Sequence, residues 1–279
     1  MILMDGKSLR NKTLNNIKEY IKDRKIDITL AIILVGNNEA SQIYVRNKIK
    51  ACEEVGIKVE FLSLDENVTE EYLCNLIKKL NKDSDITGII LQSPVPNHIN
   101  FEHCSSLIKT EKDVDGFAKE NIYNLYLNNT SLVPCTVKAI IKLIEEYKVD
   151  LEGSNVVIVG RGNIVGKPLA LALLNRNATV TIAHSKTKDL KNITSKADII
   201  ISAVGKPQLI KEDMVRNDAV VIDVGISRVN GKVVGDVDFE NVSPKCKLIT
   251  PVPGGVGPMT VAMIIDNLIL AKEMSDLNG

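Results

Sequence analysis

Short apolar runs alternate along the whole chain with longer stretches in which apolar residues recur every three to four positions. Short runs bounded by Gly, Pro or Asn are typical of buried strands, and the longer stretches are typical of amphipathic helices. A chain that repeats strand and helix favours parallel pairing, because each helix returns the chain to the start of the next strand. We therefore expect an α/β fold with mainly parallel sheets.

The pattern divides the chain into two groups of strand-helix units. In the first half it predicts strands at 28–35, 58–64 and 87–91 and helices at 6–22, 40–55 and 69–81. In the second half it predicts strands at 155–159, 179–183, 199–203, 220–224 and 247–249. We expect a helix over 136–148 to join the two halves and a helix over 259–274 to close the chain.

A chain of 279 residues exceeds the usual size of a single hydrophobic core and suggests two lobes. We expect a Rossmann-type parallel sheet in the C-terminal lobe, at 119–259. We expect a smaller βα-repeat domain at 1–118 together with 260–279. The lobes would meet across a cleft, which is where ligands usually bind.

Composition and charge exclude several classes of protein. The 35 basic and 35 acidic residues balance, which argues against a nucleic-acid partner. No apolar run reaches the roughly 18 residues of a membrane span, and residues 1–10 lack the apolar core of a signal peptide, so we expect a cytoplasmic protein. The five cysteines lie far apart and form no CxxC pair, so we expect neither disulfides nor a metal site.

The segment 154–166 has the pattern of a dinucleotide-binding turn. A buried strand leads into a turn with Gly160, Gly162 and Gly166, and a helix starts near Lys167. A pyrophosphate needs backbone N–H groups at close range, and glycine permits that approach. The spacing is one residue longer than the usual fingerprint, so a simple strand-to-helix turn is the alternative. Pro168, where a P-loop has Ser or Thr, excludes a P-loop.

The end of the next strand favours NADP over NAD. An NAD site usually has Asp or Glu there, but this chain reads Ala-His-Ser-Lys-Thr at 183–187. Without a carboxylate, Arg161, Ser185 and Lys186 could hold a 2′-phosphate. The alternative is that Arg161 and Lys186 are ordinary solvated charges.

A second group of polar residues lies in the first half. Ser41, Tyr44 and Lys48 share one face of a predicted helix and can present a ring and a proton-handling amine to one pocket. Gln92 follows a predicted strand, at the edge where parallel sheets bind ligands. A solvated helix face and a proline-rich turn are the alternatives.

Two further loops carry candidate binding groups. Asp113 and Asp115 lie in a loop that we expect to enter the cleft, although an Asp-Gly turn is the alternative. The segment 250–260 contains three prolines and three glycines before the closing helix. Its exposed amides could contact both a cofactor and a substrate, or the segment could be a hinge.

Eight motifs in a fixed order carry a resemblance to a known family. They are SxxYxxxK at 41–48, LQSPVP at 91–96, KDVDGF at 112–117, GRGNIVG at 160–166, HSKT at 184–187, DVGI at 223–226, GDV at 235–237 and TPVPGGVGPMT at 250–260. Together they closely resemble the bifunctional methylenetetrahydrofolate dehydrogenase/cyclohydrolase family over nearly the whole chain.

The resemblance implies two reactions of one-carbon metabolism. The first is NADP-dependent oxidation of 5,10-methylenetetrahydrofolate to the methenyl form, and the second is hydrolysis of that form to 10-formyltetrahydrofolate. Tetrahydrofolate derivatives are thus the expected substrates. The resemblance also implies a homodimer and a contribution to purine biosynthesis.

The resemblance assigns roles to single residues. Lys48 matches the catalytic lysine, Tyr44 an aromatic contact to the folate, and Gln92 the residue that hydrogen-bonds the lysine. Asp115 matches the pterin-binding acid. The folate-side loop is matched by Gly254 and Gly255. The expected cofactor-binding residues are Gly160, Arg161, Gly162, Gly166, Ser185, Ala203, Gly205 and Ile226.

One position departs from the family pattern. The family turn commonly has serine where this chain has Gly162. We therefore expect one phosphate hydrogen bond fewer, and a lower affinity for NADP. The hydrolytic site is unaffected by this change.

Two other functions remain to be weighed. A short-chain dehydrogenase also uses Tyr and Lys four residues apart, but there the pair follows the dinucleotide turn, whereas here it precedes the turn by more than a hundred residues. A non-catalytic NADP-sensing module would give Lys48, Gln92 and Asp115 no reason to occur together. Folate-dependent turnover distinguishes the three.

Overall fold

A computed structural model describes residues 1–129 and 132–278, which divide into two compact units. Unit 1 comprises Met1–Arg10 and Thr136–Thr260, and unit 2 comprises Asn11–Cys135 and Val261–Gly279. These bounds differ from the expected ones at both ends of the first segment. Residues 1–10 belong to unit 1, because strand β1 (Ile2–Leu3) pairs with β11 (Cys246–Ile249), the last strand of that unit. Residues 119–135 belong to unit 2 instead of unit 1.

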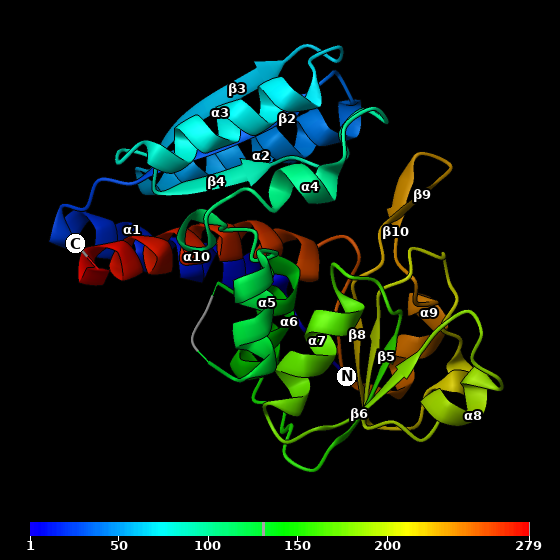
Figure 1. Cartoon of the computed structure of the whole chain (residues 1–279). Coiled ribbons are helices and arrows are strands. Elements are labelled where there is room, and N and C mark those ends of the chain that lie inside the picture. The colour runs from blue at the N-terminus through cyan, green and yellow to red at the C-terminus, as the bar shows by residue number, and fades with distance from the viewer. Residues whose placement is uncertain (130–131, 279) are drawn as a thin grey trace. The chain divides into compact units, whose positions relative to one another are not determined.

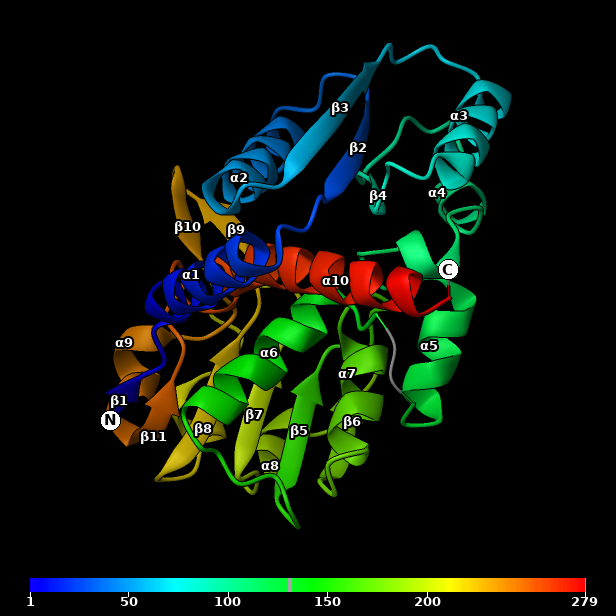
Figure 2. The same cartoon turned by 90° about the vertical axis from the view of Figure 1, so that its left-hand side faces the viewer.

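Unit 2 is built on a three-stranded parallel sheet in the order β3-β2-β4. Its strands are β2 (Thr29–Val35), β3 (Lys58–Leu64) and β4 (Gly88–Leu91). Every residue of β2 after Thr29 is buried, because helices cover both faces of the sheet. Figure 2 shows the sheet between α2 (Glu39–Val55) and α3 (Glu70–Lys82). The three predicted strands and their helices are confirmed to within one or two residues.

The core of unit 2 follows from alternation along β2. Ala31, Ile33 and Val35 point to one face and pack against Leu73 and Ile77 of α3. Among the described residues, the other helices of the unit are the remainder of α1 (Gly6–Arg24), α4 (Phe101–Ser105), η1 (Thr110–Lys112), α5 (Lys119–Tyr126) and most of α10 (Val256–Asn278). α1 and α10 each run from one unit into the other.

Unit 1 contains a six-stranded sheet in which all pairs are parallel. In sheet order the strands are β1, β11 (Cys246–Ile249), β8 (Ala219–Asp223), β7 (Ile199–Ser202), β5 (Asn155–Val159) and β6 (Thr179–Ala183). The sheet confirms the expected Rossmann-type parallel architecture. The predicted second-half strands lie within one residue of the observed bounds.

Helices cover both faces of this sheet (Figure 1). The chain's remaining described helices are α6 (Cys135–Glu146), α7 (Gly166–Leu174), α8 (Leu190–Thr194), η2 (Glu212–Met214), α9 (Phe239–Val242) and η3 (Ser243–Lys245). Val157, Ile200 and Val221 form one core face, against which Ile193 of α8 and Phe239 of α9 pack. α6 and α7 lie on the opposite face (Figure 2).

In each sheet the chain changes direction at a central strand. From β2 the chain adds β3 on one side and then crosses to add β4 on the other, and from β5 it adds β6 and then β7 in the same way. The carboxyl ends of the strands flanking such a switch point leave a crevice in which open α/β sheets bind ligands. The structure therefore contains two such positions, one after β2 and β4, and one after β5 and β7.

A hairpin and several short elements were absent from the sequence-based expectation. β9 (Ser227–Val229) and β10 (Lys232–Val234) pair in antiparallel fashion. Asn230 and Gly231 form their turn, with φ of 50° and 77°. An Asn-Gly pair between β-formers is a strong hairpin signal, but strands of three residues carry too little periodicity to be noticed.

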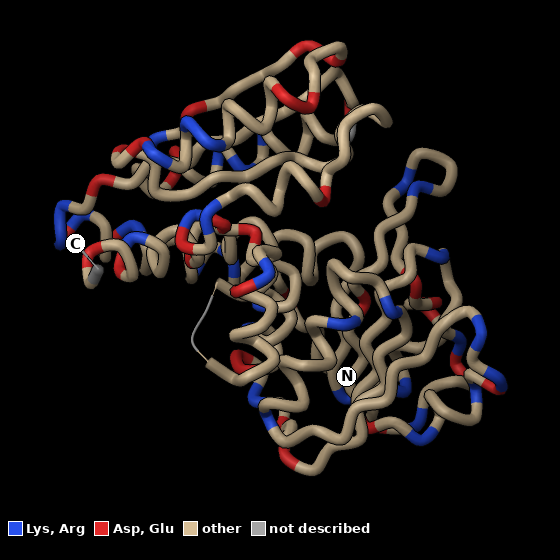
Figure 3. The backbone as a smooth tube through the Cα atoms, viewed as in Figure 1, with Lys and Arg blue, Asp and Glu red and all other residues tan. Residues whose placement is uncertain are grey.

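Charge is spread over both units. Figure 3 shows basic and acidic positions interspersed along the backbone of each. Among the described residues, none of the helices combines the length and apolar character needed to cross a bilayer.

Candidate active site

Helix α2 places the predicted lysine at the switch point of unit 2. The chain leaves β2 through Gly36, and Asn38 caps the helix by accepting a hydrogen bond from the Ser41 N–H at 2.9 Å. Three turns along, the Lys48 Nζ donates a hydrogen bond to the Gln92 Oε1 at 3.1 Å. Two residues 44 positions apart in sequence are thus brought together, as the family resemblance implied.

Gln92 is held on both sides. Its backbone N–H continues the ladder to the Ile33 carbonyl at 2.9 Å, and its side-chain Nε2 donates to the Ser93 carbonyl at 2.7 Å. The buried Ser41 hydroxyl donates to the same Ser93 carbonyl at 3.4 Å. Because the amide nitrogen is already engaged, the amide oxygen faces Lys48 in a fixed orientation.

Tyr44 and Cys52 lie one turn before and one turn after Lys48 on α2. The Tyr44 side chain is 45% exposed, so its ring face is open to a ligand. Cys52 is fully buried, and burial raises the pKa of its thiol to about 12 despite the nearby positive charge of Lys48. The thiol therefore stays protonated near neutral pH, which leaves Lys48 as the proton-handling group on this face.

The two acids of the 112–117 loop have different surroundings. Asp113 is buried and accepts hydrogen bonds from the N–H groups of Gly116 and Ala118 and from the Asn121 amide. Burial raises the pKa of Asp113 to about 6, and the negative charge of Asp115 adds to the rise. Asp113 therefore holds the loop from inside, and of the two candidate acids only Asp115 was assigned a ligand. Asp115 is half-buried.

In unit 1 the predicted phosphate-binding turn connects β5 to α7. Gly160 has φ of 129°, and a Cβ there would crowd the Ala203 carbonyl; a Cβ at Gly166 would overlap the Gly160 carbonyl. Both positions therefore require glycine. A Cβ at Gly162 would meet nothing within 4 Å. The residue before α7, Val165, makes no side-chain cap, so the positive end of the helix has no side-chain partner.

The candidate 2′-phosphate groups lie at the same edge of the sheet. Val159 and Ala183 are paired across β5 and β6, so Arg161 and Ser185 follow neighbouring strand ends. Both side chains are exposed. The turn after β6 is fixed by Thr187, whose Oγ1 accepts from the His184 N–H at 2.8 Å. Among the described residues, this turn offers hydroxyl, imidazole and ammonium groups and no carboxylate.

Two buried acids support the loops after β7 and β8. They belong to the DVGI and GDV motifs, and the sequence assigned neither of them a role. Asp236 accepts hydrogen bonds from the Ser202 hydroxyl and from the N–H groups of Val204 and Lys206, at 2.8–2.9 Å. Asp223 accepts from the N–H groups of Gly225, Asp236 and Val237. Burial raises the pKa of Asp223 to about 6.

Glycines let these carboxylates fit. A Cβ at Gly225 would overlap the Asp236 carboxyl, and a Cβ at Gly235 would overlap the Asp223 carboxyl. The DVGI and GDV motifs therefore form one interlocked unit. The sequence signal for this unit is an Asp within two residues of a Gly in each motif.

The remaining predicted cofactor residues lie on the supported loops. The Ala203 N–H bonds the Val159 carbonyl at 2.8 Å, which places Ala203 beside the phosphate-binding turn. Gly205 has φ of 66°, and its carbonyl accepts from the Ser227 hydroxyl at 3.0 Å. Ile226 is 49% exposed, so its apolar side chain is available to a flat ring.

The proline- and glycine-rich segment leads from β11 into α10. Gly254 has φ of 117°, and the Gly255 N–H bonds the Pro251 carbonyl at 2.8 Å. A Cβ at Gly6 would overlap the Gly255 carbonyl, so the start of α1 packs directly on this loop. The loop is thus fixed within unit 1, which disfavours the hinge alternative.

Comparison with known proteins identifies the family. The catalytic-domain model of tetrahydrofolate dehydrogenase/cyclohydrolase matches residues 4–115, and the NAD(P)-binding-domain model of the same family matches residues 134–276. The chain belongs to the tetrahydrofolate dehydrogenase/cyclohydrolase family. The first match contains Tyr44, Lys48, Gln92 and Asp115, and the second contains every predicted cofactor residue together with Gly254 and Gly255.

Individual relatives agree over nearly the full length. The chain is 54% identical over 276 residues to the bifunctional protein FolD of Sulfurihydrogenibium sp. (strain YO3AOP1), and the match covers 96% of each chain. The crystal structure of the bifunctional enzyme FolD from Campylobacter jejuni is 48% identical, with a TM-score of 0.96 and 99% of each chain covered.

A more distant relative was solved with a cofactor. The Trypanosoma brucei methylenetetrahydrofolate dehydrogenase-cyclohydrolase, complexed with NADP and an inhibitor, is 35% identical with a TM-score of 0.93. The match covers 99% of this chain and 98% of that one. Membership of the dehydrogenase/cyclohydrolase family excludes the short-chain dehydrogenase alternative, because the whole-chain architecture is that of the former.

Proposed function

We propose that the protein catalyses two consecutive steps of one-carbon metabolism. It oxidises 5,10-methylenetetrahydrofolate to 5,10-methenyltetrahydrofolate with NADP, and it hydrolyses the methenyl form to 10-formyltetrahydrofolate. The observation that carries the proposal is the hydrogen bond between Lys48 and the buried Gln92 at the switch point of unit 2. A purely NADP-sensing protein has no use for an oriented amine in the folate domain.

The residues of unit 1 fit NADP. The glycines at 160 and 166 let the turn pack closely on the Ala203 and Gly160 carbonyls, so that its backbone N–H groups and the uncapped start of α7 can face a pyrophosphate. Arg161 can pair with a 2′-phosphate. NADP supplies the acceptor for the hydride that leaves the methylene carbon. The task of the protein is then to orient two rings, and the loops supported by Asp223 and Asp236 are suited to that because they are rigid.

The hydrolysis step requires proton transfers, for which Lys48 is the candidate group. Water adds to the electron-poor methenyl carbon, one bond from that carbon to a ring nitrogen breaks, and one proton is released. We assign to the Lys48 amine the transfer of protons to and from these atoms. Gln92 positions the amine, because its oxygen accepts from Nζ while its nitrogen is engaged by Ser93.

The folate itself calls for flat and hydrogen-bonding surfaces. Tyr44 lies one helical turn from Lys48, and its exposed ring can stack on the pterin or the aminobenzoate ring of the folate. The Asp115 carboxylate can accept from the paired N–H donors of the pterin. We assign Gly254 and Gly255 to the folate-side loop by family resemblance.

We assign folate binding to unit 2 and NADP binding to unit 1, in line with the two family domains. The family resemblance further leads us to propose a homodimer, which sedimentation of the purified protein tests directly. We propose a cytoplasmic location, supported by five cysteines of which none forms a disulfide, since disulfides are rare in reducing compartments.

Parallel assays of the purified protein test the proposed function. One assay supplies methylenetetrahydrofolate with NADP or with NAD and follows formation of the methenyl product. The other follows the decay of added methenyltetrahydrofolate. We expect NADP-dependent formation of the methenyl product and accelerated decay of methenyltetrahydrofolate. The absence of both would indicate the non-catalytic NADP-sensing module. Decay without NADP-dependent oxidation would indicate that the turn with Gly162 has lost the dehydrogenase activity.

A further inference from the structure

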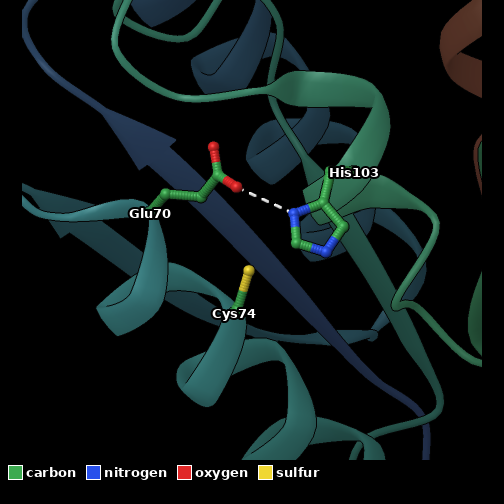
Figure 4. A group of neighbouring side chains, drawn as sticks. All are labelled: Glu70, Cys74 and His103. Carbon is green, nitrogen blue, oxygen red and sulfur yellow. Dashed lines mark hydrogen bonds and ion pairs between the residues drawn. The ribbon is translucent and has the colours of Figure 1, made fainter.

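A group of metal-ligating side chains lies where α3 meets α4, outside the residues used by the proposed function. Glu70 and Cys74 are four residues apart on one face of α3, and His103 comes from α4. Their ligand atoms all lie within 4.8 Å of one another. Figure 4 shows the three side chains pointing toward one another, with the Cys74 sulfur below the bond between Glu70 and His103.

The carboxylate and the imidazole are already oriented. One oxygen of Glu70, Oε2, accepts from the Asn100 N–H at 2.6 Å, and the other, Oε1, contacts the His103 Nδ1 at 2.8 Å. Asn100 also caps α4 by accepting from the His103 N–H at 3.0 Å. The same short loop thus fixes both ligands, as outer-shell hydrogen bonds do in metal sites.

We propose that Glu70, Cys74 and His103 bind a divalent transition metal ion of the zinc class. Thiolate, imidazole and carboxylate are the three ligand types that Zn²⁺ takes in proteins, usually in tetrahedral geometry. Tetrahedral bond lengths require about 3.4 Å between the nitrogen and oxygen and about 3.6 Å from each to the sulfur. The ligand atoms already lie within 4.8 Å of one another, so the Glu70–His103 contact of 2.8 Å has to widen by about 0.6 Å and the sulfur has to reach about 3.6 Å from each partner.

Exposure leaves room for entry of the ion and for a fourth ligand. The His103 and Glu70 side chains are 54% and 31% exposed, whereas Cys74 is 6% exposed as a residue. Three protein ligands with a water in the fourth position satisfy the ion. Binding of the metal ion releases the proton of the Cys74 thiol. If the His103 imidazole is charged, binding also releases the proton between His103 and Glu70.

A second thiol lies behind the first. Cys104 Sγ is 3.7 Å from Cys74 Sγ and is fully buried. Its thiol can donate a hydrogen bond to the sulfur of Cys74 and support that sulfur as a ligand. Cys104 is therefore a neighbour of the site and not one of the three ligands.

The sequence-based expectation of no metal site rested on the spacing of the cysteines. A site assembled from Glu70, Cys74 and His103 leaves no CxxC or compact His-Cys spacing to detect. The fold alone brings the two helices together.

Cobalt titration of the full-length, reduced and metal-stripped protein tests the proposal, since Co²⁺ bound by a thiolate in tetrahedral geometry has intense charge-transfer and visible bands. We expect one Co²⁺ per chain, displaced by one Zn²⁺. Cys74→Ser should abolish the charge-transfer band, and His103→Gln should weaken binding by more than the roughly 10- to 100-fold that is typical when only a supporting hydrogen-bond partner of a ligand is removed.

Matched controls come from the same chain. His98→Gln changes a histidine of the same loop, which bonds the Val68 carbonyl, and Cys246→Ser changes a buried cysteine of unit 1; both should bind Co²⁺ as the wild type does. Zn²⁺, but not Mg²⁺, should raise the melting temperature of the wild type and not that of Cys74→Ser, provided that circular dichroism shows both folded. No charge-transfer band, or an unchanged band in Cys74→Ser, would overturn the proposal.

Discussion

The two switch points of this protein are built in opposite ways. After β2 and β4 the candidate site consists of side chains connected to one another, with Lys48 bonded to Gln92 and Gln92 bonded to Ser93. After β5 and β7 it consists mainly of missing side chains, at Gly160 and Gly166, where a Cβ would meet a backbone carbonyl. The candidate phosphate-binding side chains there, Arg161 and Ser185, are exposed.

The difference reflects the chemistry proposed for each site. Proton transfer needs an amine held in one orientation, so it requires side chains that fix each other. Phosphate binding needs backbone amides at close range, so it requires a turn whose backbone segments pack together with no side chain between them. The first site should therefore fail when a functional group is removed, and the second should fail when a single methyl group is added.

The largest effect is expected from Lys48→Met, which removes the amine and keeps the length of the side chain. Hydrolysis of methenyltetrahydrofolate should slow by about 10² to 10⁴-fold, the usual contribution of a general acid or base. NADP affinity, measured by calorimetry, should stay within about twofold because Lys48 lies in the other unit. Lys50→Met, at an exposed position of the same helix, is the control and should retain hydrolysis.

The second effect compares two glycines of one turn. Gly166→Ala places a methyl group on the Gly160 carbonyl and should weaken NADP binding by roughly 100-fold, or about 2.7 kcal/mol. Gly162→Ala meets open space and should change the affinity by less than about threefold. Equal losses in the two variants, with both folded by circular dichroism, would refute the role assigned to close backbone approach.

A smaller effect is expected where unit 1 does use a side chain. Arg161→Ala removes a charged hydrogen-bond donor, so NADP affinity should fall by about 10- to 100-fold while NAD affinity is unchanged. Lys188→Ala, at an exposed position beyond the Ser185 turn, is the matched control. A parallel loss of NAD affinity in Arg161→Ala would place the guanidinium elsewhere than at the 2′-phosphate.

The last effect is on stability and not on ligand binding, and it concerns Asp223, the buried acid that supports the loops of unit 1. Burial raises the pKa of Asp223 from 3.8 to about 6, so the folded state binds this proton more tightly than the unfolded state does. Its contribution to stability is therefore full below about pH 4 and is lost as the pH rises through 6. Relative to Asp223→Asn, the free energy of unfolding of the wild type should fall by about 2 to 3 kcal/mol between pH 4 and pH 7. Urea unfolding at the two pH values measures it, and a flat difference would contradict the assignment.

Much of the fold was predictable because both sheets are parallel and buried. β5 is a compact, buried apolar run, and β3 mixes apolar and polar residues at the edge of its sheet; the observed bounds of both equal the predicted ones. β1 was not predicted, because its two residues show no pattern and its partner β11 lies far along the chain. The β9–β10 hairpin was not predicted, because strands of three residues are too short to show a period.

The sites were predictable only in part. The i, i+4 spacing of Tyr44 and Lys48 gives a shared face, but the contact with Gln92 depends on the pairing of β2 with β4 and was anticipated from family resemblance. Asp113 and Asp115 look alike in sequence, and only the fold turns the first inward. The interlocked Asp223 and Asp236, and the group around Cys74, arise from segments whose spacing carries no signal.

The most direct test of the account is the rate of methenyltetrahydrofolate hydrolysis by Lys48→Met beside the wild type, at saturating substrate and with NADP affinity recorded on the same preparation. The account predicts a loss of at least about 100-fold in hydrolysis with NADP binding preserved. A variant that hydrolyses the substrate at a rate near that of the wild type, or that loses both properties together, would contradict the assignment of the proton chemistry to Lys48.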